Sequence, residues 1–340
     1  MRRPYDPNAL RPMAAGHVIV VVVVALLAGG VLNAQALTDA AASQPFGWKR
    51  SIAVVAATPF RGIAGLTRLD RPHTALSRAA AGAVGDPGSA GSGTDVVAGA
   101  DDIEPGATAP PSPPPTEPAE TRGPPTRRDP LRAWVGGDSL TSEFGPALSD
   151  RLARTGRAEA DVEFRFSTGL ARPDFFDWPG RLRQLVARQD PDVFVVMFGA
   201  NDGQNIEVDG TVLEFNTPEW RTEYARRVNV VMRILAADQR TVYWIGQPIM
   251  ADSGFDAKMQ VLNAIYRAES RGHDAVTYID TRRLFSGDEG EFASYLDDAN
   301  GQSTLMRQQD GVHFTRAGGE RLTTVVFGAI DEHWGVTGSD

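Results

Sequence analysis

The residues after Pro130 predict an α/β domain with three layers, α/β/α, in which a central parallel sheet lies between two layers of helices. Short apolar segments alternate with stretches of helical pattern, which is the order of repeated βα units. Several of the apolar segments are continuous, as expected for parallel strands that are covered on both faces. In such sheets, ligand-binding side chains gather at the carboxyl ends of the strands.

Short apolar segments at five places predict the strands 133–135, 162–166, 193–198, 241–245 and 276–279. The sequence between them carries apolar stripes at helical spacing. These stripes are Phe144, Leu148 and Leu152; Met259, Leu262 and Tyr266; and Leu322, Val325, Val326 and Ile330. Thr217 before Pro218 is typical of a helix N-cap with proline at the first helical position, and it predicts a helix over 220–237.

The composition excludes several classes of protein. The 340 residues carry a formal net charge of -9 and show no concentrated basic face, so nucleic acid is not expected as a partner. The absence of cysteine excludes disulfides, thiolate metal sites and a cysteine nucleophile.

The N-terminal sequence predicts export. An apolar run over residues 18–32 follows three arginines, and its length, close to the ~20 residues that cross a bilayer, favours a retained single-pass anchor at 17–37 behind a cytoplasmic N-terminus at 1–16. Positive charge before the run predicts that the rest of the chain is extracytoplasmic. A secretory signal cleaved after residues 34–36 is the alternative, and it gives a secreted protein.

Two segments separate this run from the predicted domain. Residues 38–79 are moderately apolar with scattered basic side chains, which predicts a juxtamembrane segment. Residues 80–130 are rich in Gly, Ser, Ala and Pro and bury too little apolar surface to offset their ordering entropy, which predicts a disordered spacer. The globular domain is expected over 131–340.

The first chemical motif follows the first strand. In Gly136-Gly137-Asp138-Ser139-Leu140, the glycines allow a sharp turn, and a following helix N-terminus places backbone N–H groups beside the serine oxygen. Ser139 is therefore a candidate nucleophile. An ordinary N-cap serine is the alternative interpretation.

The second motif, Gly199-Ala200-Asn201-Asp202, follows the apolar strand at 193–198. The carboxamide of Asn201 can donate a hydrogen bond to an oxyanion without a charge that repels the attacking serine. A plain turn is the alternative, and Asp138 and Asp202 are expected to organise their turns.

The third motif, Asp310-Gly311-Val312-His313, precedes the last helical stripe. A general base for serine is a histidine held in one tautomer by an acceptor, and Asp310 is close enough in sequence to serve His313. The other histidines of the domain, His273 and His333, are expected at the surface. The polar stretch 281–309 before this motif is expected either to form a wall of the substrate cleft or to be a surface insertion.

The order and spacing of these motifs over residues 132–334 resemble the GDSL or SGNH hydrolase family. The resemblance implies a flavodoxin-like fold in which Ser139 is the nucleophile and Asp310 and His313 complete the catalytic triad. It also implies an oxyanion hole formed by the backbone N–H of Ser139, the backbone N–H of Gly169 and the side chain of Asn201. The serine turn is unlike the Gly-x-Ser-x-Gly elbow of ordinary α/β-hydrolases.

For an exported chain, the resemblance implies a serine esterase that removes O-acyl groups, with O-acetyl as the simplest, from extracytoplasmic glycan or other small esters. No metal or organic cofactor is required, and transfer of the acyl group to a sugar hydroxyl uses the same intermediate. Two other functions stay open. One is a metal-dependent phosphoesterase with Asp138, Asn201, Asp202, Asp310 and His313 as ligands, and the other is a non-catalytic glycan-binding or assembly scaffold.

Overall fold

The computed structural model describes parts of the N-terminal region and the whole of the predicted strand and helix pattern. The described residues are 15–34, 37–38, 41, 52–56, 58–59 and 123–338. The chain divides into two compact units, 1–90 and 91–340. Most of the juxtamembrane segment and the spacer up to residue 122 lie outside the described residues, so both stay predictions.

The apolar N-terminal run forms helix α1, Ala15–Leu32. Its 18 residues rise about 27 Å, slightly less than the roughly 30 Å hydrocarbon core of a bilayer. Among the residues that the structure describes, no helix is both long and apolar enough to span a membrane. The predicted transmembrane anchor over residues 17–37 is therefore not confirmed.

The second unit is built on a five-stranded sheet in which all neighbouring strands are parallel. Its order is β2-β1-β3-β6-β7. Numbered along the chain within this sheet alone, the order is 2-1-3-4-5, which is the flavodoxin-like arrangement and confirms the predicted fold class. The strands are β1 Leu131–Gly137, β2 Ala158–Phe164, β3 Val193–Met197, β6 Thr241–Ile245 and β7 Val276–Ile279.

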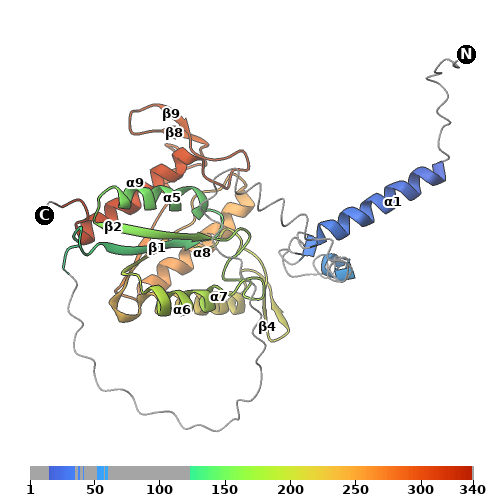
Figure 1. Ribbon diagram of the computed structural model, residues 1–340, viewed down its shortest axis with the longest axis horizontal. Helices are drawn as coiled ribbons and strands as arrows, with labels where there is room; N and C mark the ends of the chain where they lie inside the picture. The colour runs from blue at the N-terminus through green and yellow to red at the C-terminus, as the bar shows by residue number, and fades with distance from the viewer. Residues whose placement is uncertain are drawn as a thin grey trace, which may run out of the picture. The chain divides into compact units, whose positions relative to one another are not determined.

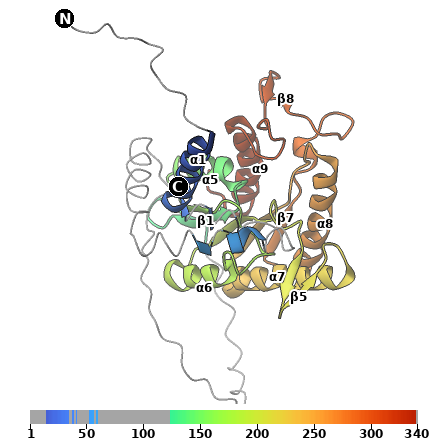
Figure 2. The ribbon, with the colours of Figure 1, turned by 90° about the vertical axis from the view of Figure 1, so that its right-hand side faces the viewer.

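Helices cover both faces of this sheet. Figure 1 shows α5 (Thr141–Ala153) and α9 (Arg316–Trp334) together on one face, and α6 (Trp178–Gln189) and α7 (Pro218–Ala236) on the other. The view turned by 90° in Figure 2 shows the same two layers. α8 (Ser253–Ser270) packs beside α7. The three-layer architecture follows directly from the alternation of strands and helices.

The predicted apolar stripes face the core with one exception. The stripes of α5 and α8 are buried, and Thr217 caps α7 by accepting the N–H of Trp220, as the sequence predicts. In α9, Val325 is 40% exposed whereas the other three positions are buried. Those three are spaced by four residues and form one row on the helix, and position 325 lies beside that row.

The structure differs from the sequence expectation at some elements. β2 begins at Ala158 and ends at Phe164, because its pairing with β1 rather than its own apolar pattern defines its length at the edge of the sheet. Helix α6 was not predicted from the apolar pattern. It is capped by Asp177, whose Oδ1 accepts the N–H of Gly180 at 3.0 Å.

Two antiparallel hairpins lie outside the main sheet and were also not predicted. They are β4–β5 (Ile206–Val208 and Thr211–Leu213) and β8–β9 (Tyr295–Asp297 and Ser303–Leu305). The second belongs to the polar stretch 281–309. The guanidinium of Arg321 on α9 donates to the carbonyl oxygens of Leu284 and Asp297, both at 2.8 Å, so this stretch is fixed to the domain.

Candidate active site

The structure brings three of the predicted residues into one line of hydrogen bonds. The Oγ of Ser139 lies 2.9 Å from the Nε2 of His313, and the Nδ1 of His313 lies 2.6 Å from the Oδ2 of Asp310. Ser139 is buried, and the His313 side chain is 31% exposed. A hydroxyl, an imidazole and a carboxylate in this order form the arrangement that prepares a serine for nucleophilic attack.

The turn that carries Ser139 begins at the carboxyl end of β1, the strand between β2 and β3. The connections diverge at this point of the sheet, which is where ligand-binding crevices form in open α/β folds. The turn requires glycine at position 137, because a Cβ there would lie 1.9 Å from the carbonyl oxygen of Met197. Since α5 starts at Thr141, the serine immediately precedes a helix N-terminus.

Asp138 joins the serine turn to the loop after β3. Its Oδ1 accepts the N–H of Leu140 at 3.0 Å, and its Oδ2 accepts those of Gly199 and Ala200 at 2.9 Å each. Burial raises the pKa of Asp138 to about 7, although the three hydrogen bonds favour the charged form. Both carboxyl oxygens are engaged by main-chain donors, which agrees with a positioning role.

The loop that carries His313 is closed by its own hydrogen bonds. The Oδ1 of Asp310 accepts the N–H groups of Val312 and His313 at 2.9 and 3.0 Å. Burial raises the pKa of Asp310, but the hydrogen bonds from the His313 ring and these two N–H groups outweigh it and bring the pKa to about 2. Asp310 is therefore a carboxylate at neutral pH, as an acceptor for the Nδ1–H of His313 must be.

The low pKa of Asp310 predicts a small stability change in acid. Because the pKa in the folded protein, about 2, lies below the ordinary value of 3.8, the stabilisation is fully present above about pH 4 and is lost as the pH falls through 2. The Asp310 side chain is 45% exposed, so solvent screening limits the loss to about 1 kcal/mol or less. The free energy of unfolding, measured by urea titration between pH 5 and pH 2, should decline less steeply with falling pH for Asp310→Asn than for the wild type. The same dependence of this free energy on pH in both proteins would contradict a stabilising role of the Asp310 carboxylate.

The expected oxyanion donors lie on three adjacent strand ends, after β1, β2 and β3. Within residues 123–338, no acceptor is bonded to the backbone N–H of Ser139 or of Gly169. The Nδ2 of Asn201 donates to the carbonyl oxygen of Thr168 at 2.9 Å, and its second N–H is left for another acceptor. Asn201 is thus bound to the residue next to Gly169, which ties two of the three donors together.

Asp202 fixes the loop that carries Gly169. Its Oδ2 accepts the N–H of Leu170 at 2.9 Å, and its Oδ1 accepts that of Ala171 at 2.8 Å. The hydroxyl of Tyr224 also donates to Oδ2, at 2.7 Å. Burial raises the pKa of Asp202, and it raises that of Tyr224 well above 10. A Cβ at position 169 would lie 2.1 Å from Asp202 Oδ1, so this close approach requires glycine.

The ligand set of the metal-dependent alternative does not come together. In the part of the chain that the structure describes, no three His, Asp or Glu side chains are grouped so that they could hold a metal ion. The carboxylates of Asp138 and Asp202 are directed to separate sets of main-chain N–H groups. Of the other histidines, His333 is exposed, and half-buried His273 contacts Asn229 at 3.2 Å.

Sequence reasoning missed Arg307, which lies under the His313 loop. Its guanidinium donates to the carbonyl oxygens of Ile249 at 2.8 Å, Gly311 at 3.3 Å and Val312 at 2.5 Å. Its side chain is fully buried among three phenylalanine rings, Phe285, Phe292 and Phe314. Burial lowers the pKa of Arg307 to about 10. Nothing in the local sequence distinguishes this arginine from the many exposed ones.

Comparisons with known proteins give one family and several partial structural likenesses. Residues 132–329, more than half of the chain, match the family described as "Protein of unknown function (DUF459)". No curated protein matches the chain. A GDSL-like lipase from Bacteroides thetaiotaomicron is 14% identical, with 62% of this chain and 93% of that chain covered and a TM-score of 0.44.

Two other solved structures are similar at the same level. A catalytic mutant of an acetylxylan esterase from Geobacillus stearothermophilus is 14% identical over 59% of this chain and 94% of its own, with a TM-score of 0.44. An alpha/beta hydrolase enzyme from the metagenome of Lake Arreo is 16% identical over 62% and 97%, with a TM-score of 0.42. Because all three TM-scores lie below 0.5, inference of activity rests on the geometry of the site itself.

Proposed function

Since the chain belongs to the family described as "Protein of unknown function (DUF459)", whose description carries no activity, we propose from the site that it is a serine hydrolase of the GDSL or SGNH type that cleaves O-acyl esters. The observation that supports this most strongly is the line from Ser139 Oγ to His313 Nε2 to Asp310 Oδ2, with separations of 2.9 and 2.6 Å. The roles of the individual residues follow from that line.

In the first half of the reaction, Ser139 Oγ attacks the ester carbonyl carbon while His313 Nε2 takes the hydroxyl proton. Asp310 accepts the Nδ1–H and stabilises the imidazolium that forms. The negative charge on the carbonyl oxygen is met by the backbone N–H groups of Ser139 and Gly169 and by the Nδ2–H of Asn201. When the C–O bond breaks, His313 returns the proton to the leaving alcohol, and the acyl group stays on the serine.

In the second half, water or a sugar hydroxyl attacks the acyl-serine with His313 as general base. Water releases the free acid, and a hydroxyl gives a new ester, so hydrolysis and transfer share one intermediate. We propose O-acetyl groups on glycan as the substrate. A donor ester with a labelled acetyl group, supplied together with abundant glycan acceptor, distinguishes the two reactions. Hydrolysis releases labelled acetate and leaves the acceptor unlabelled, whereas transfer labels the acceptor.

A fluorophosphonate probe tests the assignment of the nucleophile. The full chain should form a covalent adduct, and mass-spectrometric mapping should locate it on Ser139, because only an activated serine reacts with such a reagent. The esterase rate should be indifferent to a chelator. Activity abolished by the chelator, together with no adduct on any serine, would favour the metal-dependent phosphoesterase instead.

Asn201→Ala is expected to slow turnover by about 10² to 10³, because removal of one oxyanion donor typically has that effect. The measurement is kcat on a chromogenic acetyl ester. Asn229→Ala is a matched control, since its amide contacts Glu269 at 2.9 Å on the helical layer and should leave kcat unchanged. A wild-type kcat for the Asn201 variant would remove this side chain from the oxyanion site.

The extracytoplasmic location stays a proposal that the N-terminal sequence supports. A reporter enzyme that is active only after export, fused behind residue 130, should be active with the native N-terminus. Replacing the three arginines before residue 18 with glutamate should reduce that activity, because cytoplasmic positive charge favours export of the downstream chain. Equal reporter activity from both fusions would count against this orientation signal.

A further inference from the structure

Helix α7 carries an arginine, Arg227, whose guanidinium binds the loop after β2. Its Nη1 donates to the carbonyl oxygens of Leu170 and Ala171, at 3.0 and 2.9 Å. Its Nη2 donates to the carbonyl oxygen of Glu207 at 3.3 Å, so the same guanidinium also reaches strand β4 of the first hairpin. The Arg227 side chain is only 12% exposed. This cation is therefore directed mainly to acceptors of the protein rather than to solvent.

Glu223 holds this guanidinium in place from one turn earlier in α7. Its Oε1 accepts the Nε–H of Arg227 at 2.6 Å, and its side chain is also 12% exposed. Hydrogen bonds from Arg226 and from Arg227 outweigh burial and lower the pKa of Glu223, so this side chain is a carboxylate at neutral pH. Because the pair has i, i+4 spacing, the helix itself keeps the two side chains together. The Nη groups of Arg227 are thereby directed at the loop.

The loop after β2 is held by a carboxyl as well as by this guanidinium. Leu170 and Ala171 donate their N–H groups to Asp202, at 2.9 and 2.8 Å, while their carbonyl oxygens accept from Arg227. All the main-chain polar groups of these two buried residues are therefore bonded to one of two side chains. Burial raises the pKa of Asp202, and the positive charge of Arg227 is among the influences that oppose this rise. We call Asp202 and Arg227 the loop clamp.

Both side chains of the loop clamp are supported by α7. The hydroxyl of Tyr224, one turn before Arg227, donates to Asp202 Oδ2 at 2.7 Å. The Tyr224 ring is stacked on that of Trp220 with the centroids 4.8 Å apart, and its hydroxyl lies 2.7 Å from that of Tyr266 on α8. Figure 1 shows α7 on the face of the sheet opposite to α5, the helix that follows the serine turn. The loop is thus held from the helical layer that does not carry the nucleophile.

The clamped residues directly adjoin two of the three expected oxyanion donors. Gly169, whose N–H is one donor, precedes Leu170 in the chain. The carbonyl oxygen of Thr168 accepts the Nδ2–H of Asn201, the second donor, at 2.9 Å. Because consecutive residues are joined by rigid peptide units, a displacement of Leu170 and Ala171 moves the Gly169 N–H and the Thr168 carbonyl with it.

We propose that Arg227 is a positioning residue for the oxyanion hole, which fixes the N–H of Gly169 and, through the same loop, the side chain of Asn201. The inference rests on the proposed esterase function. Donors stabilise an oxyanion best when they are in place before the charge develops. A fixed loop therefore favours the transition state more than the bound substrate, so loss of Arg227 should lower kcat and leave KM nearly unchanged.

The test compares Arg227→Met with Arg240→Met in the full chain. Methionine keeps an unbranched side chain but has none of the N–H donors of arginine. Arg240 is a matched control, because it is 9% exposed, donates to the carbonyl oxygen of Ala237 at 2.7 Å and pairs with Asp190 at 2.9 Å. It directly precedes β6 and so lies at the end of the sheet where the strands begin.

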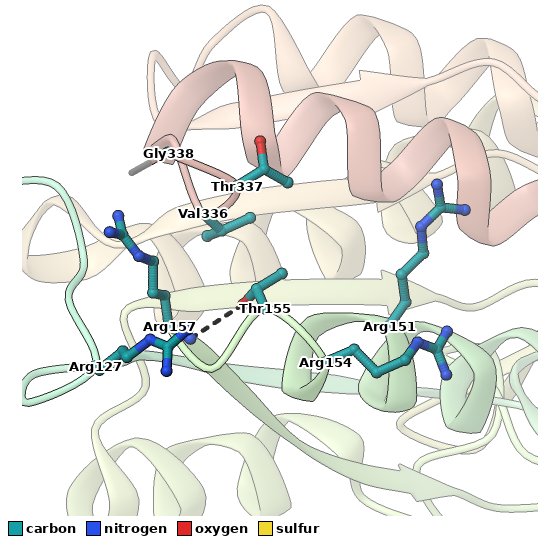
Figure 3. A pocket seen from close by; sticks show the side chains of 8 residues that line it. All are labelled: Arg127, Arg151, Arg154, Thr155, Arg157, Val336, Thr337 and Gly338. Atoms are coloured by element: carbon teal, nitrogen blue, oxygen red, sulfur yellow. Dashed lines mark hydrogen bonds between the residues drawn. The ribbon is translucent and has the colours of Figure 1, made fainter. Parts of the chain in front are cut away.

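This end of the sheet is remote from the proposed active site. Figure 3 shows it from close by, around a cavity of about 480 Å³ that Arg157, the residue before β2, helps to line. Ser139 follows the opposite end of β1, and the seven residues of that strand separate the two ends by roughly 20 Å. Arg240→Met should therefore lower stability without a change in turnover.

Arg227→Met should reduce kcat on the chromogenic acetyl ester by about 10-fold to 10²-fold, because a misplacement of about 1 Å can have that effect. KM should stay within about twofold of the wild-type value. Arg240→Met should keep the wild-type kcat and KM, although both substitutions should lower the Tm, since each removes a donor from buried acceptors. Arg227→Lys keeps the charge but not the planar fork, so kcat should recover in part. The lysine variant also replaces the methionine variant in the comparison if the latter does not fold.

Amide hydrogen exchange gives a readout that does not depend on activity. Measured at the same interval below the Tm of each protein, the N–H groups of Leu170 and Ala171 should exchange at least about tenfold faster in Arg227→Met than in the wild type. In Arg240→Met they should exchange at the wild-type rate. Faster exchange together with a lower kcat in the Arg227 variant alone supports the proposal.

Three results would overturn the proposal. They are a wild-type kcat in Arg227→Met, unchanged exchange at the two amides, and an equal loss of kcat in Arg240→Met, which would indicate general destabilisation instead. A wild-type protein that cleaves no ester would overturn the proposed function. Faster exchange in Arg227→Met would then still show that this side chain fixes the loop, whereas unchanged exchange would overturn both.

Discussion

Ser139→Ala should reduce kcat on an acetyl ester by about 10⁴ to 10⁶, because the variant loses the only atom that forms the acyl intermediate. The Oγ contributes one contact of 2.9 Å with His313, and the buried methyl group that remains fits the same space. The fold should therefore be unchanged, with the same Tm within about a degree or two. The measurement is kcat together with a thermal melt.

The double variant Ser139→Ala with His313→Ala makes this prediction sharper. Residues that act as one unit lose their effect together, so the double variant should be no slower than Ser139→Ala alone. Ser149→Ala is a matched control. Ser149 lies in α5, and its hydroxyl donates to the carbonyl oxygen of Ala160 in β2 at 2.7 Å, so its loss should affect stability only. A multiplicative loss in the double variant would mean that the serine and the histidine do not act on the same step.

Arg307→Ala should lower the free energy of unfolding by about 4 kcal/mol. The substitution opens a cavity among three phenylalanines. It also removes the Arg307 donor from the carbonyl oxygens of Ile249 and Val312, and each orphaned polar group costs about 1 to 3 kcal/mol, whereas the Gly311 oxygen still accepts the N–H of Ala251. Urea unfolding of the variant and of the wild type measures this change in the free energy of unfolding. Arg283→Ala is the control, because that arginine is exposed in the same loop region.

Arg307 should also affect turnover, because it binds the carbonyl oxygens of Gly311 and Val312 directly before His313. A displacement of His313 by about 1 Å can slow the reaction by about 10². Arg307→Lys keeps the charge and some of the donors, so kcat should recover partly while KM stays near the wild-type value. Where the alanine variant does not fold, the lysine variant carries the test, and a wild-type kcat in a destabilised lysine variant would show that Arg307 is structural only.

The residues behind these two predictions differ in how far the sequence reveals them. Ser139, Asn201 and His313 each stand in a short motif at a strand end, and strand ends converge at one edge of a parallel sheet. Their convergence could be expected from the motif order alone. Arg307 has no motif, because its role depends in part on the carbonyl oxygen of Ile249 and the sulfur of Met250, which are 58 and 57 residues away along the chain.

The same reason explains the elements that sequence reasoning missed. The two hairpins carry weak apolar patterns, so their existence depends on pairing rather than on periodicity. Helix α6 does carry an apolar stripe at helical spacing, Trp178, Leu182 and Leu185, which is the signal that could have revealed it. The apolar side chain of Val325 predicts a core position, although its place on α9 turns it outward. The predicted membrane anchor rests on the length of an apolar run, and helix α1 ends at Leu32.

The sequence by itself determined the alternation of strands and helices, the parallel sheet, and the three motifs from which the serine, the asparagine and the histidine come, because periodicity and strand-end chemistry are local properties of the chain. Only the tertiary structure decided the 2.9 Å approach of Ser139 to His313 and the burial of Arg307. Those features arise between segments that are distant in sequence, where distance and burial, rather than residue type, determine what a side chain does.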